Sequence, residues 1–92
     1  MKKKINVGII GRNFGYKVIY KALIKHKYFN VIGFSFKKKI SNIILPKNIK
    51  IYKNWKQLVS NKKIKAIFIA SPPNTHKEII NFSLKKKKTY IL

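Results

Sequence analysis

The chain of 92 residues has almost no acidic side chains and no cysteine. Glu78 is its only side-chain carboxylate, against 23 lysine and arginine residues, so the formal net charge is +22. Acid–base catalysis by a carboxylate pair is therefore excluded. The absence of cysteine excludes disulfides, thiolate nucleophiles and cysteine-ligated metals, and two histidines with one glutamate make no convincing metal site.

Long apolar runs are absent as well. No window approaches the roughly 18 consecutive apolar residues that a membrane-spanning helix needs. The basic start is followed by an apolar stretch over residues 5–10 only, which Asn6 interrupts, and Arg12 follows with no small-residue cleavage site, so it is not a signal peptide. We expect a single-domain cytoplasmic protein with no membrane partner.

The excess of lysine has two explanations. Lys, Asn, Ile, Phe and Tyr, the residues that A/T-rich codons encode, dominate the sequence. Codon bias with a solvated basic face is the first explanation, but it does not account for the lack of glutamate, which also has an A/T-rich codon. The alternative is an anionic partner, such as nucleic acid bound through non-specific charge or an acidic protein.

Apolar runs alternate with segments of helical periodicity along the chain. This alternation is typical of βαβ units and predicts an α/β fold with a parallel sheet of about five strands and helices on both faces, a three-layer arrangement. The expected strands are residues 5–10, 31–36, 51–52, 64–70 and 89–92, and the expected helices are residues 14–28, 54–61 and the segment from Thr75 to about Lys88.

Several residues mark the expected ends of these helices. Asn54 is a plausible N-cap of the second helix. Thr75 and Glu78 have the spacing of a capping box at the start of the third, and the run of lysines at residues 85–88 places cations at its negative dipole end. Pro46 argues against a central strand in residues 37–48.

The turn after the first strand carries two glycines. Gly11, Asn13, Phe14 and Gly15 join this strand directly to the first helix. Unpaired backbone N–H groups and the positive end of a helix dipole would converge there on an anion such as a pyrophosphate. The alternative is that both glycines serve turn geometry and close helix–strand packing only.

A second motif makes the whole chain resemble a known family. The strand over residues 64–70 is followed by Ser71-Pro72-Pro73-Asn74-Thr75-His76. Together with the glycine turn, this stretch is similar to the N-terminal nucleotide-binding segment of the glucose-fructose oxidoreductase, inositol dehydrogenase and MocA (Gfo/Idh/MocA) family, and implies a partial Rossmann-like NAD(P)-binding domain over residues 1–92.

The resemblance also implies roles for these residues. Gly11, Asn13, Phe14 and Gly15 would lie against the cofactor pyrophosphate. Ser71, Pro72, Asn74 and His76 would line the far side of the nucleotide cleft, and His76 is alternatively a positioning or packing residue. In this family a later Glu-Lys-Pro motif and a second α/β domain supply catalysis and bind the substrate. Neither is present here, so we expect a truncated chain that does not catalyse alone, and whose partner is a separate catalytic domain or a second copy.

The end of the second strand bears on the choice of cofactor. An NAD-selective site usually has an acid there that binds the ribose 2′-hydroxyl. Here Ser35 and Lys37 occupy this region, without an acid. A serine and lysines could hold a 2′-phosphate, so NADP is favoured over NAD. The alternative is a solvated run of lysines.

Three functions therefore stay open. The favoured one is a nucleotide-binding domain of an NAD(P)-dependent oxidoreductase. The second is a small basic nucleic-acid-binding or assembly protein, although its aromatic residues suit core packing better than base stacking. The third is a non-functional remnant, or one piece of a split enzyme.

Overall fold

The described residues form one parallel sheet. The computed structural model describes residues 4–11, 15–36, 48–70 and 73–92. In these residues five strands lie in the order β3-β2-β1-β4-β5, and every neighbouring pair is parallel. The strands are β1 (Ile5–Gly11), β2 (Phe29–Phe36), β3 (Lys50–Tyr52), β4 (Ala66–Ala70) and β5 (Thr89–Ile91).

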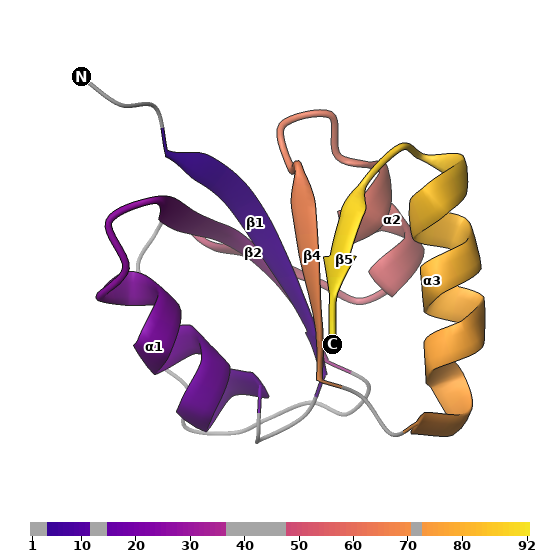
Figure 1. Ribbon diagram of the computed structural model, residues 1–92, viewed down its shortest axis with the longest axis horizontal. Helices are drawn as coiled ribbons and strands as arrows, with labels where there is room; N and C mark the ends of the chain where they lie inside the picture. Colours follow the sequence, from indigo (N-terminus) through magenta and orange to yellow (C-terminus); the bar gives the residue numbers. More distant parts are fainter. Residues whose placement is uncertain (1–3, 12–14, 37–47, 71–72) are drawn as a thin grey trace.

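Helices cover both faces of this sheet (Figure 1). One face carries a continuous helical segment, a π-helix η1 (Gly15–Tyr20) followed by α1 (Lys21–Ile24). The other face carries α2 (Trp55–Ser60) and α3 (His76–Lys85), and the short 3₁₀-helix η2 (Pro73–Thr75) precedes α3. The predicted three-layer α/β fold with a parallel sheet is confirmed.

The core consists of two clusters, one on each face of the sheet. Side chains alternate across β1, so Val7 and Ile9 belong to the cluster under α1 while Ile10 belongs to the cluster under α2 and α3. β4 alternates in the same way, with Ala66 on the first face and Ile67 on the second. A strand that is buried on both faces reads as a continuous apolar run, which explains why β1 and β4 were readily predicted.

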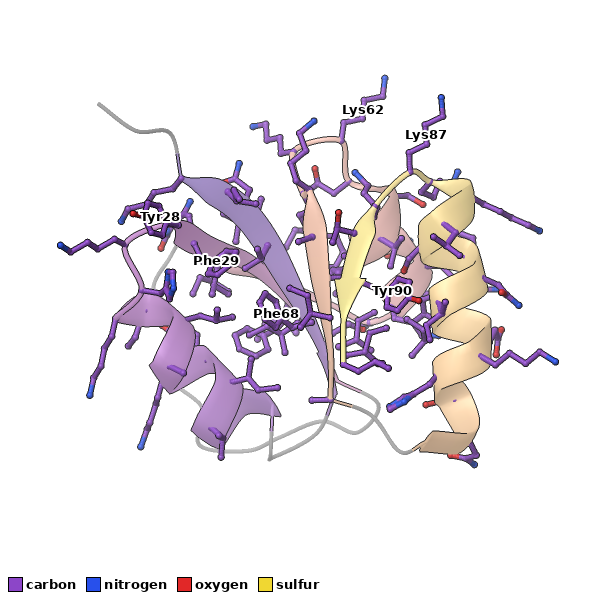
Figure 2. All side chains as sticks on the ribbon, viewed as in Figure 1. Tyr28, Phe29, Lys62, Phe68, Lys87 and Tyr90 are labelled. Carbon is purple, nitrogen blue, oxygen red and sulfur yellow. The ribbon has the colours of Figure 1, made fainter. Side chains whose placement is uncertain are left out.

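Aromatic rings fill the larger spaces between the layers. Tyr52 is buried, and the rings of Trp55 and Phe82 meet edge to face with their centroids 5.4 Å apart, so these three rings pack in the core. On the other face Phe29 and Phe68 meet at 5.6 Å between α1 and the sheet (Figure 2).

The helix ends differ in part from the prediction. Asn54 caps α2 as predicted, since its side chain accepts a hydrogen bond from the Lys56 backbone N–H at 2.9 Å. The prediction of a capping box at Thr75 is wrong, because the side chain of Thr75 makes no capping hydrogen bond at the start of α3. Thr75 ends η2 with helical dihedrals, φ −101° and ψ −9°, whereas a capping residue adopts extended ones.

The first helix is shorter than its periodicity predicts. It ends at Ile24 instead of Tyr28, and β2 begins at Phe29 instead of Val31. Parallel pairing of Phe29 with Ile5 extends β2 toward its start. The turn between them is closed by His26, whose Nδ1 accepts a hydrogen bond from the Tyr28 backbone N–H at 3.2 Å.

Candidate nucleotide-binding site

The carboxyl ends of the three central strands meet at one edge of the sheet. Gly11, the last residue of β1, is in register with Phe36 of β2 on one side and with Ala70 of β4 on the other. The chain goes from β1 outward to β2 and β3, and then returns to the opposite side of β1 with β4. In open α/β sheets, ligands bind outside the carboxyl ends of the strands at such a switch point.

Gly11 is required at this point for space. A Cβ atom on Gly11 would lie 2.9 Å from the Cβ of Ala70 and 3.0 Å from its carbonyl carbon and oxygen. No glycine among the described residues has a positive φ, so conformational freedom is not what Gly11 provides. Its lack of a side chain allows β1 and β4 to approach closely where the first crossover leaves the sheet.

Ala70 was not singled out from the sequence, although it makes this close approach with Gly11. The sequence feature that could have identified it is a small residue at the end of a strand that otherwise contains the large residues Ile67, Phe68 and Ile69. A larger side chain at this position would press against Gly11.

Two helical segments begin at the same edge of the sheet. The first begins at Gly15, four residues after the end of β1, and η2 with α3 begins at Pro73, three residues after the end of β4. The first N–H groups of a helix lack intrahelical partners and carry the positive end of its dipole. The arrangement therefore places two sets of unpaired backbone donors at the same edge of the sheet as the switch point, which suits a diphosphate.

The remaining predicted site residues fall into two groups. Ser35 is in β2 and is 3% exposed, Asn74 is exposed in η2, and His76 is half-buried at the start of α3. The other predicted residues lie outside the described residues, and their roles stay predictions: Asn13, Phe14, Lys37, Ser71 and Pro72.

The charges of this region favour an anion. Glu78, the only side-chain carboxylate of the chain, lies in the first turn of α3 with an oxygen 3.9 Å from the Lys56 ammonium. Both side chains are at least half exposed, so this pair contributes little stability. No other side-chain carboxylate exists to repel an anionic ligand.

Two classes of feature are not found in the part of the chain that the structure describes. Residues 4–11, 15–36, 48–70 and 73–92 contain no group of three or more His, Asp or Glu side chains that could hold a metal ion. None of the helices in these ranges has the length and apolar character needed to cross a bilayer.

Solved structures share this fold. The chain superimposes on a 3-ketoreductase from Actinomadura kijaniata in complex with NADP with a TM-score of 0.85 and 17% identity, covering 97% of this chain and 28% of that one. A biliverdin reductase from Synechocystis in complex with biliverdin and NADP+ matches with a TM-score of 0.79 and 18% identity, over 94% and 28% of the two chains. A D-galactose-1-dehydrogenase from Rhizobium etli matches with a TM-score of 0.79 and 17% identity, over 100% and 29%.

These matches define both the fold and the extent of the likeness. The chain spans less than a third of the length of each of these structures. No curated protein matches the sequence. The model of the oxidoreductase family with an NAD-binding Rossmann fold, Gfo/Idh/MocA, matches residues 5–92. The chain therefore belongs to the Gfo/Idh/MocA oxidoreductase family and corresponds to its NAD-binding Rossmann fold.

Proposed function

We propose that the chain binds a nicotinamide dinucleotide at the carboxyl edge of its sheet and is the cofactor-binding part of an NAD(P)-dependent oxidoreductase. The observation that carries this proposal is the close approach of Gly11 to Ala70 at the switch point, with helical segments beginning just beyond both strand ends. Family membership and the NADP complexes of two structural relatives support it.

The donor set fits the pyrophosphate of the cofactor. Backbone N–H groups at the start of η1 and of η2 with α3 would donate to the phosphate oxygens, and no carboxylate opposes them. We assign Gly11, Asn13, Phe14 and Gly15 to the pyrophosphate. We assign Ser71, Pro72, Asn74 and His76 to the opposite wall. The bound cofactor would supply hydride transfer, and the groups that hold a substrate would come from another domain or polypeptide.

The sequence at the end of β2 favours NADP. No acid stands in the residues just after Ser35, and Lys37 is the first of three successive lysines. Since Ser35 is buried in the strand, the lysine is the stronger candidate for the 2′-phosphate. A charge-assisted hydrogen bond of this kind contributes about 1.5–3 kcal/mol, which corresponds to a preference for NADPH of about tenfold or more over NADH.

Fluorescence titration of the full chain with NADPH and with NADH tests both statements. We expect saturable binding with NADPH preferred. The Lys37→Gln variant should lose most of the preference and keep NADH affinity, whereas the matched Lys53→Gln variant, altered at an exposed lysine after β3, should bind as wild type does. Failure to bind either dinucleotide would refute the proposed function and favour the remnant hypothesis.

A further inference from the structure

The amino ends of β4 and β5 form a basic surface at the edge of the sheet opposite the nucleotide site. We call it the lysine edge and define it by five exposed lysines: Lys62, Lys63, Lys65, Lys86 and Lys87. Three come from the loop between α2 and β4, and two from the turn between α3 and β5. Figure 2 shows Lys62 and Lys87 near one another, with both side chains pointing away from the body of the protein.

Hydrogen bonds join the two lysine-rich segments, residues 61–65 and 85–89, although these are far apart in the sequence. The Lys88 ammonium donates hydrogen bonds to the backbone oxygens of Asn61, at 2.8 Å, and of Ile64. The Thr89 backbone N–H donates to the Lys65 carbonyl oxygen at 3.1 Å. The turn is itself fixed, because the N–H groups of Lys87 and Lys88 close the end of α3 on the carbonyl oxygens of Leu84 and Ser83.

Like charges are therefore held close together without neutralisation. Burial lowers the pKa of Lys88, and the positive charge of Lys65 lowers it further. Glu78 is the only acid, eight residues before Lys86 along the helix, or about 12 Å at 1.5 Å per residue. This separation exceeds the Debye length of about 8 Å at physiological ionic strength, so Glu78 screens the lysine edge very little.

The other residues of the two segments indicate which class of anionic partner this surface suits. Residues 61–65 and 85–89 contain only Asn, Lys and Thr besides Ile64, which is fully buried. Neither segment itself contributes an exposed apolar side chain to insert into a lipid bilayer or an aromatic ring to stack on unpaired bases, and exposed Leu84 and Tyr90 only flank the second segment. What remains is a cluster of point charges on two backbone segments that hydrogen bonds hold together, which suits the closely spaced phosphates of a duplex, one charge per about 1.7 Å of helix axis.

We propose that the lysine edge binds the phosphate backbone of double-stranded nucleic acid without sequence preference. The surface is separated from the nucleotide site by the length of the strands, about 16–23 Å for five to seven residues. The two sites therefore do not overlap, and a dinucleotide and a duplex are bound at the same time.

The experiment measures the anisotropy of a fluorescent random DNA duplex of about 20 base pairs between about 50 and 200 mM salt. The edge variant combines Lys62→Gln, Lys63→Gln and Lys87→Gln. The control variant makes the same change of charge at exposed lysines elsewhere, with Lys21→Gln, Lys53→Gln and Lys77→Gln.

We expect the edge variant to bind the duplex at least tenfold more weakly, with a salt slope smaller by about 3, one unit for each phosphate that the protein no longer neutralises. The control variant should bind less than threefold more weakly, and circular dichroism should show both variants folded. Saturating NADPH should leave duplex affinity unchanged.

Two results would overturn the proposal. Equal losses of affinity in the two variants would mean that the total charge, and not this surface, attracts the duplex. Binding to phosphatidylserine vesicles that exceeds duplex binding and depends on the same three lysines would assign the surface to a membrane instead. Neither result bears on dinucleotide binding, which the NADPH titration measures separately.

Discussion

Replacing Gly11 by alanine is the sharpest test of the contact between β1 and β4. The new Cβ would lie 2.9–3.0 Å from three atoms of Ala70, two of which are backbone atoms. Carbon atoms in contact normally lie about 3.5–4.0 Å apart, so the strands must separate by about 0.5–1 Å at this point. Parallel pairing from Val7 to Gly11 and apolar side chains on both faces resist this movement. We expect the free energy of unfolding to fall by about 1–3 kcal/mol, the usual cost of overpacking.

Urea unfolding of wild type, Gly11→Ala, Ala70→Gly and the double variant measures this cost. Ala70→Gly removes the nearest of the three atoms but leaves the carbonyl carbon and oxygen at 3.0 Å. The double variant should therefore recover part of the loss, and its free energy of unfolding should exceed the value expected from adding the two single changes. A loss below about 0.5 kcal/mol for Gly11→Ala, or strict additivity, would refute this packing argument.

Three further predictions concern the lysines. Lys87 has φ 58°, so Lys87→Gly should stabilise the chain by about 0.5–1 kcal/mol in urea unfolding, whereas Lys86→Gly, at φ −90°, should destabilise it. Burial, and secondly the charge of Lys65, lower the pKa of Lys88 in the folded state. As the pH approaches the ordinary lysine value of 10.5, the unfolded chain therefore binds more protons than the folded chain. The free energy of unfolding should rise with pH in this window. Lys88→Met should show a smaller rise, and an equal rise would contradict the assignment. Since the net charge is +22, added salt or phosphate should raise the melting temperature, and a flat response in calorimetry would count against both charge repulsion and the anion site.

The central strands were predictable because their signal is local. β1 and β4 are buried on both faces, so nearly every residue in them is apolar, and the run alone identifies the strand. Asn54 was predictable for a similar reason, since its cap depends on a backbone N–H only two residues away. In each case the deciding contacts are those that any chain with this pattern would make.

Other features depend on contacts that the local pattern does not contain. Apolar and lysine residues continue with helical spacing to Tyr28, yet pairing with Ile5 draws Phe29 into β2 and the helix ends at Ile24. Thr75 has the sequence of a capping box, but the preceding 3₁₀ turn already holds it in a helical conformation. Long-range pairing in one case and a neighbouring turn in the other outweigh the local preference.

The same distinction applies to the candidate site. Gly11 was identified from the sequence because a glycine between a strand and a helix is a recognised pattern, but its contact with Ala70 required the strand order. In the same way, the composition shows the net charge of the chain but not where the charged side chains lie on its surface. Codon bias can explain why there are many lysines, yet it does not explain why Lys88 ties the turn after α3 to the loop before β4. The parallel sheet brings these lysines to one edge and Gly11 to the other, so the two proposed anion sites can be tested independently.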